Sequence, residues 1–487
     1  MARRVEIRTE ITLEDYGSYA HLSPAVRELE AEARLLVPRL EDRTVWMVNS
    51  TARGGGVAEM LPTMVGLLRQ LGIPTEWVVI ESDDPDFFTL TKRIHNLIHG
   101  EGDPGFDDGH RALYERVAEE NAAQLRKWIS PGDIVIIHDP QPMALASFLA
   151  EDPDPVLIWR CHIGLDESNA ATKGVWEFLR PYAGDYRTAV FSAPEYIPEI
   201  FPGATVIYPA IDPLTRKNRE LSIHRLCGIL ENSALSAALG PVVTPRYPHV
   251  AHRVSPEGDT VPADSMGDLG LLNRPVVAQV SRWDRLKGFA WVLEAFVKVK
   301  RLLHGGDGME PVHRRRLELA RLVLAGPDPT AVEDDPEGQE VFAELAARYA
   351  ELDPGLQEDI AVVSLPMASR AENALMVNAL QRTSSVVVQN SLREGFGLTV
   401  AEAMWKRIPV LSNSQACGPR QQIRDGIDGR LAEDPTDADE LARLLNQMLA
   451  KHEARDTWGR TAQRRAYDEF LIFAQIRKWL RVLVEQV

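Results

Sequence analysis

Two carboxylates flank a glycine-rich turn in the segment REGFGLTVAEAM, residues 393–404. Seven residues separate Glu394, in the turn itself, from Glu402, on a helix that we expect to start near Leu398. A carboxylate on such a loop can accept hydrogen bonds from sugar hydroxyls. A second carboxylate about one turn into the helix can hold a nearby diol, such as a ribose. The spacing therefore predicts a site for a ligand rich in hydroxyl groups.

Phosphate could bind beside these carboxylates. The backbone amides of Gly397, Leu398 and Thr399 would form a helix N-terminus, which favours an anion. Further towards the N-terminus, the segment VSRWDRLKG carries Arg282 and Lys287 in a loop that follows a predicted strand. A cationic pair at that place could neutralise a diphosphate leaving group. Each of these residues alone is more often part of a surface salt bridge, but together, at strand ends, they indicate a site.

A weaker signal is the segment NSTARGGGVAEM, Asn49–Met60, directly after the first strong strand. Consecutive glycines allow the backbone to approach a ligand closely and to turn into a helix whose N-terminus favours an anion. The spacing matches neither the dinucleotide fingerprint GxGxxG nor a Walker loop. A tight turn without any ligand remains open for this segment alone.

Short apolar runs alternate with helical stretches and would position these residues. Such continuous β-branched runs are typical of buried parallel strands. The first series is Thr44–Asn49, Glu76–Ile80, Asp133–His138, Val156–Arg160, Thr188–Ser192 and Thr205–Tyr208. The second series is Pro275–Ser281, Arg321–Ala325, Ile360–Ser364, Ser385–Gln389 and Pro409–Ser412. Two βα series predict an α/β protein with two doubly wound domains that face each other across a cleft.

The predicted domain boundaries follow from these series. We expect a first domain over residues 1–213, a linker and insertion over 214–273, and a second domain over 274–463. Residues from about 240 to 270 are rich in Pro, Gly and polar side chains, and this predicts a long mobile loop. An apolar face on the last helix, residues 464–487, predicts that it returns to pack on the first domain.

Composition excludes several classes of function. The chain has 487 residues with 54 Lys and Arg against 71 Asp and Glu, a formal charge of −17. This balance argues against a sequence-independent grip on nucleic acid. The widely spaced Cys161, Cys227 and Cys417 indicate neither a disulfide framework nor a zinc site. Since we find no signal peptide and no apolar run that could cross a bilayer, we expect a cytoplasmic protein without a membrane span.

The combination VSRxDxxKG and RxEGFGLxxxEAM resembles the retaining nucleotide-sugar glycosyltransferases of GT-B fold, a group that includes sucrose and trehalose synthases. The N-terminal motifs are VNSTxxGGGVAEM, IESDDPDFFTLTKRIHNLIHG, VIIHDPQP and WRCHIGLD. They resemble the trehalose glycosyltransferring synthases, which join nucleotide-activated glucose to free glucose, and the related retaining trehalose phosphorylases. The resemblance covers nearly the whole chain except residues 240–270. It implies two Rossmann-like domains and a retaining hexosyl transfer.

The resemblance also implies roles on the donor side. Glu394 would bind the hydroxyls of the donor hexose, and Glu402 would bind the ribose. Arg282 and Lys287 would hold the diphosphate. His162, at the end of a first-domain strand, would face the donor sugar across the cleft.

Further roles fall on loops of the first domain. Gly55 and Gly56 would let the loop after the first strand close over the donor. His138, Asp139 and Gln141 would line the acceptor side. The substrates would then be a nucleotide diphosphate glucose and a small sugar acceptor. No cofactor is implied, and catalysis should need no metal.

Two features depart from the family pattern. Ala416-Cys417-Gly418 stands where relatives commonly have a Gly pair near the pyrophosphate, and we expect Gly418 to supply a shifted amide contact. The insertion at 240–270 has no counterpart in the trehalose synthases. A third segment, Asp83-Asp84-Pro85-Asp86, mimics the DxD metal motif of another glycosyltransferase fold. Because it follows a first-domain strand, we do not assign a metal to it.

Several alternatives stay open or are disfavoured. A phosphorylase that splits trehalose with inorganic phosphate would place that phosphate at Arg282 and Lys287. A nucleotide-sugar epimerase is disfavoured by the Glu394 and Glu402 pattern, and a non-catalytic relative is disfavoured because all four residues are present. The sequence names neither the nucleotide base, which we expect to be read by backbone atoms near Leu365–Met367, nor the acceptor. It also leaves a homodimer open.

Overall fold

Each half of the chain is built on its own, largely parallel sheet in the computed structural model, which describes residues 1–487 except 8–10, 53–55, 238–244, 306–307 and 332–335. Unit 1 comprises Met1–Ala210 together with Ile472–Val487, and unit 2 comprises Ile211–Leu471. The two strand series of the sequence therefore fall into separate units, and the α/β prediction is confirmed.

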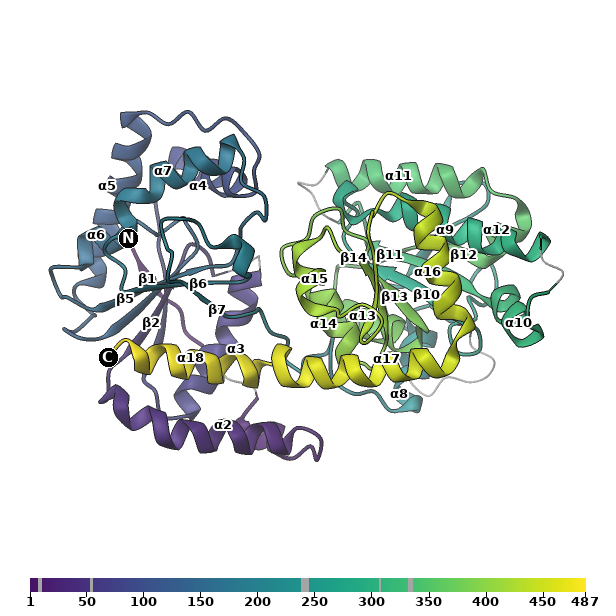
Figure 1. The fold of residues 1–487 in the computed structure, drawn as a ribbon, viewed down its shortest axis with the longest axis horizontal. Helices are drawn as coiled ribbons and strands as arrows, with labels where there is room; N and C mark the ends of the chain where they lie inside the picture. Colours follow the sequence, from purple (N-terminus) through teal and green to yellow (C-terminus); the bar gives the residue numbers. More distant parts are fainter. Residues whose placement is uncertain (8–10, 53–55, 238–244, 306–307, 332–335) are drawn as a thin grey trace. The chain divides into compact units, whose positions relative to one another are not determined.

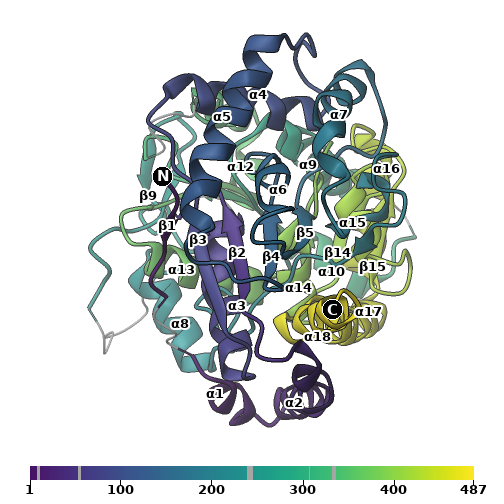
Figure 2. The same ribbon diagram turned by 90° about the vertical axis from the view of Figure 1, so that its left-hand side faces the viewer.

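The sheet of unit 1 has the order β1-β3-β2-β4-β5-β6-β7, and Figure 2 shows β3, β2, β4 and β5 side by side. Its strands are β1 (Arg3–Arg4), β2 (Val45–Asn49), β3 (Thr75–Val79), β4 (Ile134–His138), β5 (Val156–Cys161), β6 (Thr188–Phe191) and β7 (Thr205–Val206). Neighbours are parallel except for β1, which runs antiparallel to β3. Every residue of β2 and β4 is buried, which explains their continuous apolar runs. Strand order reverses between β2 and β4, so the loops after these strands are neighbours.

Helices cover both faces of this sheet (Figure 1). They are α1 (Leu13–Gly17), α2 (Ser23–Leu36), α3 (Gly56–Gln70), α4 (Pro85–Ile98), α5 (Asp108–Leu125), α6 (Leu145–Leu149), α7 (Ala170–Ala183) and the C-terminal α18 (Ile472–Glu485). Helix α18 lies beside α2, where Arg477 contacts Glu32 at 2.6 Å, and its Phe473 meets Tyr16 of α1 edge to face at 5.1 Å. The last helix thus packs on unit 1, although it follows unit 2 in the sequence.

The single helix predicted over 464–487 is two helices in the structure. Helix α17 (His452–Arg465) belongs to unit 2 and runs into a π-helical turn, Ala466–Phe470. Leu471 is extended, and α18 begins after it. The backbone N–H of Ile211 donates to the carbonyl of Phe470 at 2.8 Å. Continuous amphipathic patterning hid this break, because apolar residues occur on both sides of it.

The sheet of unit 2 has the order β15-β14-β13-β10-β11-β12-β8-β9. Its strands are β8 (His252–Val254), β9 (Thr260–Pro262), β10 (Val276–Val280), β11 (Arg321–Pro327), β12 (Ile360–Leu365), β13 (Val386–Val388), β14 (Val410–Asn413) and β15 (Gly429–Ala432). The parallel part runs outward from β10 through β11 to β12, then returns to β13 and continues through β14 to β15. This is the doubly wound order, and its reversal lies between β10 and β13.

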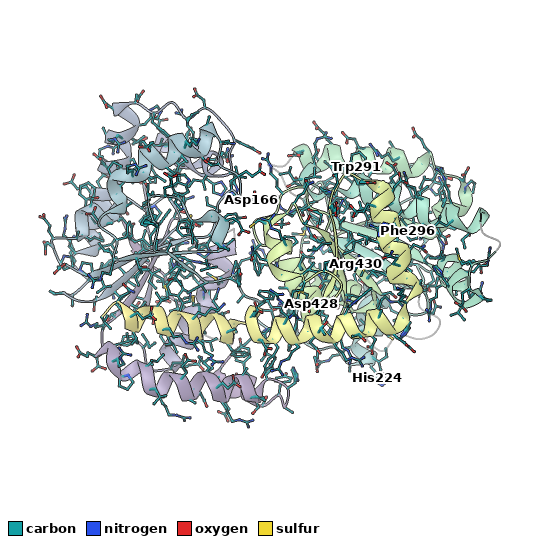
Figure 3. The ribbon with its side chains drawn as sticks, viewed as in Figure 1. Asp166, His224, Trp291, Phe296, Asp428 and Arg430 are labelled. Carbon is teal, nitrogen blue, oxygen red and sulfur yellow. The ribbon has the colours of Figure 1, made fainter. Side chains whose placement is uncertain are left out.

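Two apolar cores cover the two faces of this sheet. The core on one face includes Phe296 of α9, fully buried and labelled in Figure 3, and the core on the other includes Leu380 of α13. The helices are α8 (Ile223–Asn232), α9 (Phe289–Arg301), α10 (Pro311–Leu319), α11 (Pro336–Ala350), α12 (Pro354–Asp359), α13 (Arg370–Thr383), α14 (Leu398–Trp405), α15 (Cys417–Gln422), α16 (Ala438–Ala450) and α17. Within the described ranges, no helix is both long and apolar enough to cross a membrane.

The predicted mobile loop at 240–270 is wrong for its described part. Strands β8 and β9 form an antiparallel hairpin, and β8 pairs with β12 through Val363 and Arg253. The hairpin covers an edge of the sheet that would otherwise expose unpaired backbone groups. Three-residue strands within a Pro- and Gly-rich segment are too short to show periodicity, so composition alone suggested a loop.

Candidate active site

Lys287 and Glu394 meet where the strand order of unit 2 reverses. Lys287 ends the 3₁₀ turn Arg285–Lys287 after β10, and Glu394 lies in the loop after β13. The Lys287 Nζ atom lies 2.5 Å from Glu394 Oε2, although the residues are 107 positions apart. Their side chains are only 14% and 16% exposed. Ligands of doubly wound sheets bind at this kind of position, outside the carboxyl ends of the strands.

Side chains of the β13 loop hold the Glu394 carboxylate in place. Glu394 Oε2 also accepts hydrogen bonds from Ser391 Oγ at 3.0 Å and from Gln389 Nε2 at 3.4 Å. The carboxylate is therefore oriented and paired, and a ligand hydroxyl or phosphate would have to share or replace the Lys287 contact.

Glycine is required next to Lys287. Gly288 has a φ of 64°, in the left-handed region. A Cβ atom there would lie 2.3 Å from the backbone oxygen of Asn390. The turn is also held by Gln279, whose Nε2 donates to the Lys287 carbonyl at 2.7 Å. The close packing of the two loops fixes the backbone that carries the lysine.

Helix α14 begins at the site, as the sequence predicts. Gly397 caps it with φ 78° and ψ 69°, Leu398 is its first residue, and Thr399 is partly exposed. The amide of Gly418, expected to contact a pyrophosphate, instead donates to the carbonyl of Glu394 at 3.1 Å. A Cβ on Gly418 would lie 2.2 Å from the Phe396 carbonyl oxygen, so this glycine supports the turn by close packing. The expected ligand contact of Gly418 is therefore not what the structure shows.

Glu402 is only 4% exposed, on the second turn of α14. Its Oε1 lies 3.5 Å from the ammonium of Lys217, which is 45% exposed. Lys406, one turn further along, is buried and donates to Gln381 Oε1 at 2.6 Å and to Asn218 Oδ1 at 3.2 Å. Burial lowers the pKa of Lys406 to about 7, although the nearby Glu402 opposes this change. Glu402, which the sequence predicts to bind a ribose, thus already has a cationic partner, Lys217, in the structure.

Arg282 is placed differently from Lys287. Its side chain is 69% exposed and contacts Asp284 Oδ2 at 3.5 Å. The structure therefore brings Lys287 and Glu394 together but leaves Arg282 extended into solvent on the same loop. Its role in holding a diphosphate remains a prediction.

In unit 1, His162 and Asp139 meet at the carboxyl ends of β4 and β5. The His162 backbone N–H donates to Asp139 Oδ1 at 2.8 Å, and Asp139 itself has a left-handed φ of 64°. Burial raises the pKa of the Asp139 carboxyl to about 6, although the His162 amide and the Arg160 charge act in the opposite direction. Burial also lowers the pKa of the fully enclosed Arg160 to about 10. His162 is partly exposed, and Asp166 follows in the same loop (Figure 3).

His138 is fully buried, so it cannot line the acceptor side directly as predicted. Its ring contacts His162 instead. Gln141 does face open space, because it lines a cavity of about 800 Å³ at the carboxyl ends of the unit 1 strands. Gln141 Oε1 is buried and has no hydrogen-bond partner within the described part of the chain.

The same cavity is lined by an aromatic and a cationic side chain of α4. Phe88 is 51% exposed, and Lys92 is exposed one turn further along the helix. Asp84 of the DxD-like segment caps α4, accepting from the Asp86 amide at 3.0 Å, and contacts Arg116 at 2.5 Å. That segment therefore has a structural role as a helix cap.

The glycine loop after β2 is only partly described. Gly55 lies outside the described residues, and its predicted role is not addressed by the structure. Gly56 is the first residue of α3 and is exposed, and a Cβ there would meet no described atom within 4 Å. Packing therefore does not demand glycine at position 56.

Two family models match the chain, one on each unit. The model described as trehalose synthase, N-terminal domain, matches residues 47–198, and that described as glycosyl transferases group 1 matches residues 266–465. The trehalose synthase of Pyrococcus horikoshii is 34% identical over 473 residues, which cover 97% of this chain and 95% of the relative. The chain belongs to the trehalose synthase family. The resemblance drawn from its motifs is confirmed.

More distant proteins share the fold of this trehalose synthase family member. The trehalose phosphorylase of Grifola frondosa is 24% identical over 90% of this chain and 56% of the relative. The solved structure of an alpha,alpha-trehalose-phosphate synthase (UDP-forming) from Burkholderia xenovorans, in complex with glucose-6-phosphate, has a TM-score of 0.59 at 15% identity. It covers 91% of this chain and 99% of the solved chain. This likeness confirms the GT-B fold.

Sequence reasoning missed two residues beside the sites of this trehalose synthase family member. Lys217 contacts Glu402 from a segment read as a linker, and Met47 contacts His138 from within a buried strand. The motif IDPLTRKN, residues 211–218, was the available signal for Lys217, because Asp212 and Asn218 in it suggest a structured turn. No signal was available for Met47, which looks like any core residue.

Proposed function

We propose that the chain is a retaining glycosyltransferase that moves a glucosyl group from a nucleotide diphosphate glucose to glucose, giving trehalose. The observation that carries this proposal is the Lys287–Glu394 pair at the strand reversal of unit 2, next to the N-terminus of α14. A cation, a helix N-terminus and an oriented carboxylate match a donor with a diphosphate and a hexose. Membership of the trehalose synthase family supports the product.

Each donor group has a task in this scheme. Lys287, together with Arg282, stabilises the negative charge that develops on the departing diphosphate. Glu394 accepts hydrogen bonds from hexose hydroxyls, and Glu402 accepts them from the ribose. The departing phosphate helps to deprotonate the acceptor hydroxyl, which attacks from the same face, so the configuration is retained. No carboxylate nucleophile is needed, and the protein contributes positioning and charge stabilisation.

The acceptor binds in the cavity of unit 1. Gln141 lines this cavity, and Phe88 offers an exposed ring on which the apolar face of a hexose can lie. Such a mixture of an aromatic surface with a few polar groups is typical of small-molecule sites. An acceptor other than glucose remains a competing form of the proposal.

The second candidate is a retaining trehalose phosphorylase, favoured by the match to the Grifola frondosa enzyme. The same cations would then hold inorganic phosphate. A nucleotide-release assay separates the two. The protein is incubated with ADP-, UDP- or GDP-glucose in turn, with and without glucose, and the products are read by anomeric proton NMR.

Each outcome of this assay assigns the reaction. Glucose-dependent release of the nucleotide with an α,α-linked disaccharide supports the synthase and names the donor. Donor binding without glucose-dependent release points to another acceptor. Glucose 1-phosphate formed from trehalose and phosphate, with no response to any nucleotide sugar, would assign the phosphorylase.

A further inference from the structure

Three side chains on neighbouring strands of unit 1 form a chain of contacts that ends at His162. Met47 lies on β2, His138 ends β4, and His162 follows β5. His138 Nε2 lies 3.4 Å from Met47 Sδ, and His138 Nδ1 lies 3.0 Å from His162 Nε2. Met47 and His138 have no exposed surface, whereas His162 is partly exposed.

The two imidazole rings meet edge to edge in nearly one plane. Their planes differ by 10°, and their centroids lie 5.3 Å apart. The two nitrogens in contact are 3.0 Å apart, and two ring radii account for the remaining separation of the centroids. Both nitrogens therefore lie close to the line between the centroids. This is the alignment of a direct N–H···N hydrogen bond, in which one nitrogen must donate and the other accept.

The sulfur decides the direction of this hydrogen bond. A thioether has no hydrogen to donate, so the proton must be on His138 Nε2. A neutral imidazole carries one N–H, which leaves His138 Nδ1 as an acceptor, and His162 Nε2 must then donate to it. Burial lowers the pKa of His138 to about 3 and that of His162 well below its ordinary value, so both rings are neutral.

We propose that Met47 and His138 are positioning residues that hold His162 as the Nε2–H tautomer, so that its Nδ1 accepts a hydrogen bond from a sugar hydroxyl. The inference rests on the proposed function for the identity of the hydroxyl, but not for the tautomer. The Asp139 carboxylate fixes the backbone of His162 at the same time. In the opposite tautomer, His162 Nδ1 would carry the hydrogen. It could then donate to the sugar hydroxyl but could not accept a hydrogen bond from it.

Nitrogen-15 NMR of the ring nitrogens tests the tautomer without any substrate. The full chain is labelled with ring-¹⁵N histidine, and long-range ¹H–¹⁵N correlations are recorded at neutral pH. The His138→Phe and His162→Ala variants assign the two rings by the loss of their signals. We expect Nε2 to be protonated and Nδ1 bare on both rings. A His162 ring protonated at Nδ1 would overturn the proposal even if the enzyme makes trehalose.

Substitution of Met47 tests whether the sulfur sets the tautomer. Met47→Leu keeps an apolar side chain but removes the acceptor for His138 Nε2–H. We expect its His162 nitrogen shifts to move towards a mixture of the two tautomers. The matched control is Met64→Leu, a fully buried methionine of α3 that should leave these shifts unchanged. Unchanged shifts in Met47→Leu, or equal changes in the control, would overturn the proposal.

A double-mutant cycle tests whether His138 acts through His162. We expect His138→Phe to lower kcat about tenfold, the size expected for one lost hydrogen bond. In the His162→Ala background the same substitution should have an effect smaller than about twofold, since coupled residues are not additive. Thermal unfolding checks that each variant is folded. If the folded double variant lost kcat by the product of the two single losses, His138 would act independently of His162, and this would overturn the proposal.

Discussion

Replacing Lys287 by alanine should abolish most transfer while leaving the fold intact. The ammonium lies 2.5 Å from Glu394 at the strand reversal of unit 2, and both side chains are largely enclosed. Removal of one preorganised group that stabilises charge in the transition state typically lowers kcat by about 10²- to 10³-fold. We expect a loss of this size in kcat for a nucleotide sugar donor.

The cost in stability can be worked from the same contacts. Lys287→Ala leaves the Glu394 carboxylate without its cation, and a buried polar group without a partner costs about 1–3 kcal/mol. Ser391 and Gln389 still donate to this carboxylate, which places the loss near the lower end of that range. A loss of about 1 kcal/mol lowers the Tm of a domain of this size by about 2–4 °C. The variant should therefore remain folded at assay temperature.

The assay measures nucleotide release at varied donor concentration, together with thermal unfolding of each variant. Arg285→Ala is the matched control, because Arg285 lies in the same 3₁₀ turn but contacts Glu344 of α11 at 2.9 and 2.8 Å. An exposed ion pair contributes little, so its kcat should stay within about threefold of the parent. Near-parental turnover in Lys287→Ala, or an equal loss in the control, would refute the donor-site assignment.

Three further predictions concern the donor and acceptor sites. Glu402→Gln and Lys217→Met should each raise the KM for the nucleotide sugar about tenfold with little change in kcat, and a kcat effect without a KM effect would contradict this. Gly288→Ala should lower the Tm and the activity, because its Cβ would overlap a backbone oxygen at 2.3 Å, whereas Gly56→Ala should leave the Tm unchanged. An equal Tm for the two glycine variants would show that the close approach is not tight. Gln141→Leu should raise the KM for the acceptor, measured at saturating donor, without changing that for the donor, and the reverse pattern would place the acceptor elsewhere.

The two series of strands could be predicted from the sequence because buried parallel strands leave continuous apolar runs. That Lys287 and Glu394 lie in loops after strands follows from this pattern, whereas the pairing of β10 with β13 that brings them together does not. The β8–β9 hairpin was not readable. Three-residue strands leave no periodicity, and their pairing with β12 depends on an edge that exists only after folding.

The site was predicted less completely than the fold. The position of His138 at the end of an apolar run marks the carboxyl edge of the sheet, but not whether its ring faces solvent or a neighbouring strand. Whether Gly418 offers its amide to a ligand depends on a carbonyl brought to it by the Glu394 turn. Such contacts join segments distant in sequence, and a single sequence contains no pattern that pairs them.

The most direct test of retaining transfer follows one labelled carbon. Nucleotide diphosphate [1-¹³C]glucose, with the α configuration, is incubated with unlabelled glucose and the protein, and the anomeric carbon is followed by ¹³C NMR. Our account predicts that the label appears in one ring of an α,α-linked disaccharide at the rate of nucleotide release, and that Lys287→Ala loses both signals together. A β-linked product, or label released as free glucose at the same rate with or without acceptor, would contradict it.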